Sequence, residues 1–205
     1  TISASDEYGL PTALDDEVIL GLIQLTNQSG FEERKVHFTR YELIKLLGWR
    51  DDTKSYDRVS ESLKRWLGVT LYYDKAWWSK DEQCWVSENF HILDQVTIYD
   101  KERRERRLKT KKGDAQAGRS SFVWNEVVYD SFQAGYLKKI DLDFYRELDS
   151  SISKRIYRFL DKRFYKKEKL IFDMQEFALE HVGLSRGYHN GEIKRRLTPA
   201  VTELE

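Results

Sequence analysis

The side chains that most often carry out chemistry are scattered in this 205-residue sequence. The four histidines are residues 37, 91, 181 and 189, and they form no His-x-His pair. A metal-dependent nicking nuclease would use such a pair to hold a cation beside a nucleophilic tyrosine. The twelve tyrosines include none that a sequence feature would activate. We therefore predict a binding protein that is not an enzyme and needs no metal or cofactor.

Other catalytic motifs are also missing from the sequence. It has no G-x-x-x-x-G-K-[ST] or G-x-G-x-x-G phosphate loop and no G-x-S-x-G nucleophile turn. A Ser-His-Asp triad assembled from distant parts of the chain stays open at this stage, because such triads are recognised by geometry.

The first candidate binding residues lie on a predicted helix over residues 54–67, "KSYDRVSESLKRWL". Its polar face combines hydroxyl groups with Lys and Arg, a mixture that suits hydrogen bonds to bases and phosphates in a major groove. A solvated face with pairs such as Glu61–Arg65 is an equally good interpretation, whereas Trp66 is predicted to belong to the core. The candidate DNA-binding residues of this segment are Lys54, Ser55, Tyr56, Arg58 and Arg65.

A second predicted helix, over residues 190–204, is more basic than the first. It contains Lys194, Arg195 and Arg196, and Glu192 is its only acid before Thr198. We therefore favour this helix over the first for DNA contact, with a solvated face as the alternative. Its candidate DNA-binding residues, with those just before it, are Arg186, Tyr188, His189, Asn190, Lys194 and Arg195.

A basic run, "KERRERRLKTKKGDAQAGR", covers residues 101–119. It holds nine Lys or Arg residues and three acids, which gives a local charge of +6, whereas residues 1–33 hold seven acids and no Lys or Arg. Fields act locally, so this asymmetry matters more than the net charge of zero. The run is either an arm along phosphates or a solvated linker. The candidate phosphate-contacting residues are Arg103, Arg104, Arg106, Arg107, Lys109, Lys111 and Lys112.

The composition is that of a globular protein with an ionic surface. Hydrophobic residues make up 40% of the chain and charged residues 34%, and no run is long enough to span a membrane. The single cysteine, Cys84, excludes a disulfide framework and a cysteine-rich zinc site. We predict a cytoplasmic protein. The sequence begins with Thr1 rather than Met, so we expect a fragment.

The first half of the chain has the element order of a winged helix. A helix is predicted over 14–30 with Asp15 and Asp16 as its N-cap, followed by the strand "KVHF" and a helix whose Thr39 and Glu42 form a capping box. The helix over 54–67 follows, and then two β-rich runs, "VTLYYDKAWW" and "CWVSENFHILDQVTIYD", joined by the polar turn "SKDEQ". We assign residues 1–100 to a first winged-helix domain and 101–119 to a basic linker or loop.

The second half repeats this order. A helix "SSISKRIYRFLDKRF", a strand "KLIFD" and a helix "DMQEFALEHVG" precede the helix over 190–204, and "SSFVWNEVVYDSF" supplies a further strand. An offset of 134 residues places Val59 on Ile193 and Leu63 on Leu197, which favours two copies of one unit. Pro199 is predicted to kink the last helix or to start a new one near Leu197. We therefore expect an α+β fold of two tandem winged-helix domains, the second over 120–205 and truncated before its wing.

The predicted hairpin of the first half carries more tryptophan than one sheet face needs. Trp77, Trp78 and Trp85 could cover a partner, such as a second copy of the chain or the second domain. Core packing is the alternative for at least one of them.

Long stretches of the sequence resemble the replication initiator protein A family of bacterial plasmids. They include "GLPTALDDEVILGLIQLT", "FTRYELIKLLGW", "SYDRVSESLKRWLGVTLYYDKAWW", "FHILDQVTIYD", "SFQAGYLKKIDLDFY", "KRIYRFLDKRFY" and "KRRLTPAVTELE". That family is similar to the iteron-binding initiators, which have tandem winged-helix domains.

The resemblance implies a plasmid replication initiator that binds repeated, double-stranded origin DNA through recognition helices. It also implies host replication proteins as partners and a dimer–monomer switch, in which the first domain dimerises and the second reads the repeat. A winged-helix transcriptional regulator and a protein-interaction module for dimerisation stay open as alternatives.

Overall fold

The pairing of the strand β6 (Ser120–Trp124) determines where the first unit ends and the second begins. The computed structural model describes residues 1–79, 83–99, 119–135, 140–164 and 167–205. The chain forms two units, Thr1–Leu137 and Lys138–Glu205. We expected residues 120–137 in the second domain, but β6 pairs antiparallel with β2 and β5 of the first unit. The boundary therefore lies near residue 137.

Three helices form one side of the first unit: α1 (Ala13–Gln28), α2 (Arg40–Leu46) and α3 (Thr53–Leu67). The capping box of α2 is confirmed, since the Glu42 carboxylate accepts from the Thr39 N–H at 2.8 Å and the Thr39 hydroxyl accepts from the Glu42 N–H at 3.1 Å. The N-cap of α1 was predicted one turn too late. Thr12 is the cap, and its N–H and hydroxyl donate to Asp15 at 2.6 and 2.8 Å.

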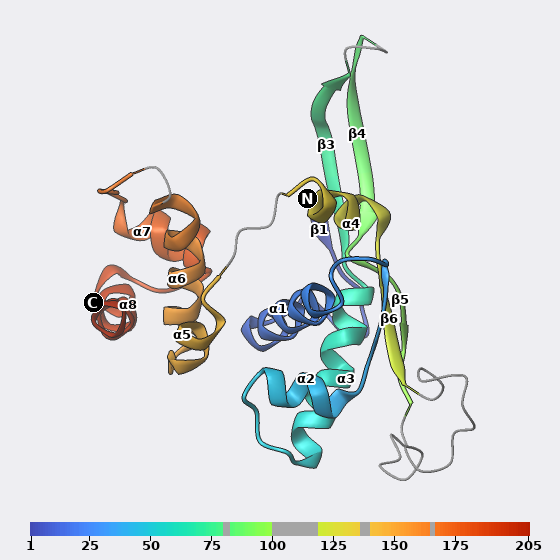
Figure 1. Ribbon diagram of the computed structural model, residues 1–205. Coiled ribbons are helices and arrows are strands. Elements are labelled where there is room, and N and C mark those ends of the chain that lie inside the picture. Colours follow the sequence, from blue (N-terminus) through green and yellow to red (C-terminus); the bar gives the residue numbers. More distant parts are fainter. Residues whose placement is uncertain (80–82, 100–118, 136–139, 165–166) are drawn as a thin grey trace, which may run out of the picture. The chain divides into compact units, whose positions relative to one another are not determined.

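Two three-stranded antiparallel sheets complete the first unit (Figure 1). One has the order β1–β3–β4 and the other β2–β6–β5. Their strands are β1 (Ile2–Ser3), β2 (Lys35–Phe38), β3 (Thr70–Ser79), β4 (Cys84–His91) and β5 (Leu93–Thr97). The second predicted β-rich run is thus two strands, β4 and β5, in different sheets. The expected helix–strand–helix–helix–hairpin order is present, but β2 pairs with β6 rather than with the hairpin β3–β4.

The core of the first unit joins the helices to the sheet of β2, β6 and β5. Phe122 and Trp124 of β6 are fully buried and meet edge to face, and Phe38 meets Phe122 in the same way. The Trp124 indole donates to the Thr26 hydroxyl of α1 at 2.8 Å, so its polar atom is satisfied. Trp66 packs against this core, as predicted.

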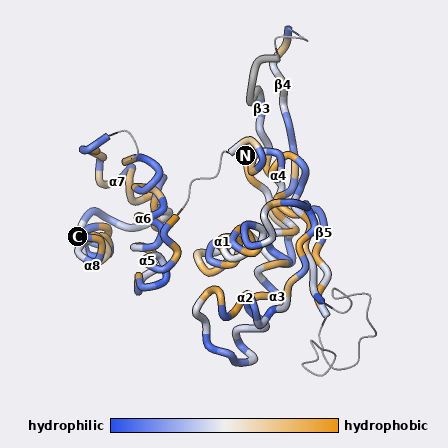
Figure 2. Tube along the Cα trace, in the orientation of Figure 1, coloured by the Kyte–Doolittle hydropathy of each residue, from blue (hydrophilic) through white to orange (hydrophobic). Residues whose placement is uncertain are grey.

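All the regular secondary structure in the described residues of the second unit is helical. It consists of α5 (Leu142–Glu147), α6 (Ser151–Phe164), α7 (Met174–Glu176) with the π-helical turn η2 (Phe177–Val182), and α8 (Asn190–Leu204). Its core contains Ile156, Ala178, Val182, Ile193, Leu197 and Ala200. Figure 2 shows how hydrophobic and hydrophilic residues alternate along these helices.

One expectation about the second unit was wrong, and one of the two alternatives for Pro199 is excluded. The segment "KLIFD" is not a strand, because no described segment of this unit pairs with it. Instead, Phe172 packs against Phe159 and Phe177, and Ile171 is left 83% exposed. The last helix does not restart near Leu197 but continues through Pro199 to Leu204.

α4 (Glu126–Gln133) follows β6 and belongs to the first unit. Its Tyr129 hydroxyl and Gln133 side-chain amide both donate to the Phe31 carbonyl, at 2.5 and 2.6 Å. Across the described parts of the chain, no helix is long and apolar enough to cross a membrane.

Candidate nucleic-acid interface

Ser55 of α3 does not face solvent. It is only 3% exposed, and Ser62 is buried beside it. Both lie on the face that carries Val59 and Leu63 into the core, because residues three and four apart share one side of a helix. The prediction that the Ser55 side chain contacts DNA is therefore contradicted by its burial.

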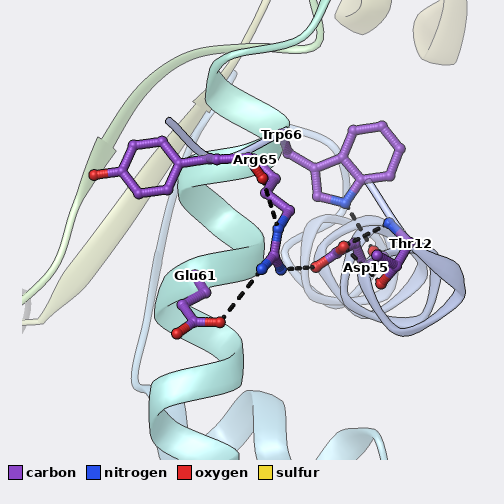
Figure 3. Close-up of polar contacts among 6 residues, drawn as sticks. Thr12, Asp15, Glu61, Arg65 and Trp66 are labelled. Carbon is purple, nitrogen blue, oxygen red and sulfur yellow. Dashed lines mark hydrogen bonds and ion pairs between the residues drawn. The ribbon is translucent and has the colours of Figure 1, made fainter. Parts of the chain in front are cut away.

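Arg65 of α3 is a structural residue (Figure 3). Its Nη1 lies 3.1 Å from Oδ1 of Asp15, which is only 2% exposed, and its Nε donates to the Tyr8 carbonyl at 3.1 Å. Its Nη2 lies 3.4 Å from the Glu61 carboxylate. The beginning of α1 is further held by the Trp66 indole, which donates to the Asp15 carbonyl at 2.7 Å. Arg65 thus fastens α3 to α1, and its guanidinium is held by three groups of the protein itself.

Tyr56 and Arg58 are half-buried, and Lys54 is exposed. The Tyr56 hydroxyl donates to Asp51 at 3.1 Å, and the Arg40 guanidinium lies 5.5 Å from the Tyr56 ring centroid. These contacts hold Tyr56 against the protein. Of the predicted DNA-binding residues of α3, only Lys54 is exposed.

Two carboxylates occupy the exposed side of α3. Asp57 and Glu61 are both exposed and lie four residues apart, opposite buried Val59 and Leu63. Carboxylates on this face repel phosphates across a groove. Lys54 and Lys64 are exposed on the same side, so the exposed face of α3 has no net positive charge and suits DNA less well than a basic face.

The exposed face of α8 has a different character. Lys194 and Arg195 are both exposed, and the Arg195 side chain is 74% accessible. Small and hydroxyl-bearing residues, Gly191, Thr198 and Thr202, continue the same side of the helix and are also exposed. Small side chains allow a helix to approach base edges closely, and the carboxylate nearest to Arg195 is that of Glu192, one turn before it.

Glu192 organises two arginines of α8. Its carboxylate lies 2.9 Å from Nη2 of Arg195 and 3.2 Å from Nη2 of Arg196. The hydrogen bond from Arg195 is the main cause that lowers the pKa of Glu192. The Arg196 guanidinium also covers the Tyr188 ring at 4.5 Å from its centroid, so Tyr188 is engaged within the unit.

The beginning of α8 carries the remaining predicted residues. His189 is the N-cap, and its Nδ1 accepts from the Glu192 N–H at 3.1 Å. The Asn190 Oδ1 accepts from Nε2 of Gln175 at 2.7 Å. Arg186 is 81% accessible and pairs with Glu180 at 3.0 Å. The structure therefore brings together His189, Asn190, Lys194 and Arg195 at one exposed end of α8.

The other predicted contact residues lie outside the described part of the chain. This holds for the whole phosphate-contacting group of residues 103–112. Arg119, the last residue of the basic run, pairs with Glu42 at 2.5 Å. The side chains of Trp77 and Trp78 also lie outside what the structure describes, whereas Trp85 is 56% exposed. Within the described residues, no three His, Cys, Asp or Glu side chains gather as metal ligands.

Sequence reasoning missed Gln175, which touches a candidate reading residue from another helix. Its position in the first turn of the helix predicted over "DMQEFALEHVG" was visible, and Asp173 caps that helix in the structure. The contact with Asn190 depends on how α7 and α8 pack, which no local pattern shows.

Comparisons with known proteins found a matching family model and two similar crystal structures. A family model described as Replication initiator protein A matches residues 1–181. None of the curated proteins matches the sequence. A crystal structure of domains 2 and 3 of RctB, from selenomethionine derivatives, aligns with a TM-score of 0.70 at 15% identity, over 99% of this chain and 71% of that one. Another crystal structure of RctB domains 2–3 aligns at 0.62 and 17% identity, over 99% and 72%. These likenesses show a mixed helix-and-sheet fold resembling the RctB domains.

Proposed function

The chain belongs to the replication initiator protein A family, and from that premise we propose that it binds repeated origin DNA sequence-specifically through α8. Family membership supports a role in the initiation of replication. The proposal adds the ligand, double-stranded DNA repeats, and the element that reads it. The homodimer and the host replication proteins implied by the resemblance stay predictions.

The exposed face of α8 carries this proposal. A recognition helix uses its N-terminal residues to contact base edges in the major groove. The N-terminal half of α8 offers Lys194 and Arg195 beside the small residue Gly191. The corresponding face of α3 combines Asp57 and Glu61 with Lys54 and Lys64, so it carries no net positive charge. The positive charge and the small side chains of its exposed face together favour α8 as the reading helix. The role left to α3 is to hold the first unit together.

A binding titration tests the proposed function. The wild-type chain is titrated against a labelled duplex from the region flanking its gene and against a shuffled duplex of equal length, at several salt concentrations. We expect tighter binding to the flanking duplex by at least about 1,000-fold, as for specific binders, and weaker binding to both duplexes as salt rises. Equal affinity for the two duplexes would show that the chain does not read sequence.

A further inference from the structure

One hydrogen bond links α7 to α8, the proposed reading helix. The Gln175 side-chain amide donates from Nε2 to Oδ1 of Asn190 at 2.7 Å. Gln175 lies in the first turn of α7, where its backbone N–H donates to the cap residue Asp173 at 2.9 Å. Asn190 is the first residue of α8. Both side chains are exposed, so their hydrogen bond lies at the protein surface.

This bond orients the Asn190 amide. Its oxygen points to Gln175, and within the described residues no atom accepts from its Nδ2. An asparagine that reads adenine uses both ends of its amide, because the oxygen accepts from N6 while the nitrogen donates to N7. Here Gln175 already donates to the oxygen, whereas Nδ2 has no acceptor among the described residues, so the Nδ2 donor is the group that Asn190 has free for a base.

The residues around Asn190 determine where its Nδ2 donor lies on α8. His189 caps α8 immediately before Asn190 and sets the start of the helix. Lys194 follows Asn190 by four residues, so the two side chains share one side of α8. The Nδ2 group therefore lies at the end of the exposed face, on the side of the helix that also carries Lys194.

We propose that Asn190 is a specificity-determining residue that donates from Nδ2 to a base acceptor, guanine O6 or N7 or thymine O4, and that Gln175 is the residue that positions it. This inference rests on the proposed function, since it requires α8 to enter the major groove. It adds the chemistry of one base contact and the residue that sets its direction.

Three substitutions in the full chain separate the two roles. Asn190→Ala removes the donor. Gln175→Met keeps the length of the side chain and removes the hydrogen bond, so the Asn190 amide can turn. Gln175→Glu replaces the donor with an acceptor, which holds Asn190 by its nitrogen and turns the oxygen outward. The negative charge of Gln175→Glu weakens binding to all sequences alike and cancels in a ratio of affinities.

The measurement is the relative affinity of each protein for single-base-pair variants of the sequence that the wild-type chain enriches from a random duplex pool. We expect Asn190→Ala and Gln175→Met to reduce discrimination at the same base pair by about tenfold, with other positions unchanged. Gln175→Glu should shift preference at that base pair toward adenine or cytosine, which present amino donors. A misfolded variant would lose all positions together, and thermal unfolding of each variant checks this directly.

Three results would overturn parts of the account separately. A wild-type profile retained by Asn190→Ala excludes Asn190 as a reading residue. A wild-type profile retained by Gln175→Met excludes Gln175 as its positioning residue. If the wild-type chain enriches no sequence at all, the proposed function itself is wrong.

Discussion

At the scale of single residues, exposure decides which cations are available for DNA. Arg65 and Arg195 look equivalent in the sequence, since each is an arginine within a basic helix. In the structure, the Arg65 guanidinium contacts the buried Asp15 carboxylate and the Tyr8 carbonyl, whereas the Arg195 side chain has one carboxylate partner and is 74% accessible. A surface pair of the second kind is worth little and exchanges readily for a phosphate.

Replacing Arg65 should therefore weaken the fold of the first unit. In Arg65→Met, the Asp15 carboxylate loses a charged partner while it stays buried, and we expect unfolding to become easier by about 2 kcal/mol. All six tryptophans lie in the first unit, so urea unfolding followed by tryptophan fluorescence reports this unit alone. Glu61→Gln, which removes only the exposed partner of Arg65, should change the free energy of unfolding by less than about 0.5 kcal/mol.

Two outcomes would contradict this role of Arg65. One is an Arg65→Met chain as stable as the wild type. The other is a chain that folds normally but loses DNA affinity, which would return Arg65 to the set of contact residues.

At the scale of elements, α8 is anchored at both ends. Its beginning is linked to α7 through Gln175 and Asn190, and near its end the Glu203 carboxylate accepts from the Ser153 hydroxyl and the Asp149 N–H at the start of α6. A carboxylate near the N-terminus of α6 is also favoured by the helix dipole. Together the two anchors hold the proposed reading helix in place.

The Glu203 anchor should depend on pH. The hydrogen bond from Ser153 is the main cause that lowers the pKa of Glu203 in the folded chain. A carboxyl with a lowered pKa stabilises the fold above its unfolded pKa, about 4.3, and this contribution is lost as the pH falls through the folded pKa. We expect Glu203→Gln to destabilise the second unit by about 1 kcal/mol at pH 7, discounted for partial exposure, and by less at pH 3.

Far-UV circular dichroism during thermal unfolding at the two pH values measures this difference. Glu205→Gln is the matched control, since Glu205 is exposed at the C-terminal end of α8. A Glu203→Gln effect of equal size at both pH values would mean that the charge of Glu203 contributes nothing.

Patterns of neighbouring residues predicted most of these helices and strands. They did not predict the pairings between segments that are far apart in the sequence. The helical periods and the Thr39–Glu42 capping box depend on residues within one or two turns, so they were visible in the sequence. "KLIFD" has strand-forming residues, but a strand also needs a partner, and the described residues of its unit supply none. A strand was expected over residues 120–132, but only 120–124 form one, and α4 covers most of the rest. The pairing of β6 with β2 joins residues about 85 apart, which no local pattern predicts.

The candidate site shows the same division. The burial of Ser55 follows from its place four residues before Val59, and a strict reading of the helical face would have found it. The contacts of Arg65 with Asp15 and of Gln175 with Asn190 join separate helices. They require the packing of the elements to be known.

At the scale of the whole molecule, the proposed function assigns different roles to the two units. The first unit holds the tryptophans, both sheets and a helix, α3, whose cation Arg65 is bound internally. The second unit is smaller and carries the exposed cations of α8. The central claim is that sequence-specific DNA binding depends on α8 rather than on α3.

Two double variants with the same change in charge test that claim most directly. Lys194→Ala with Arg195→Ala removes two cations from α8, and Lys54→Ala with Arg58→Ala removes two from α3. Each is titrated against the duplex flanking the gene at one salt concentration, beside the wild-type chain. We predict that the α8 variant loses at least about 100-fold in affinity, since each lost contact costs about 1–3 kcal/mol, and that the α3 variant loses less than about tenfold. An α3 variant that binds as weakly as the α8 variant, or more weakly, would contradict the account.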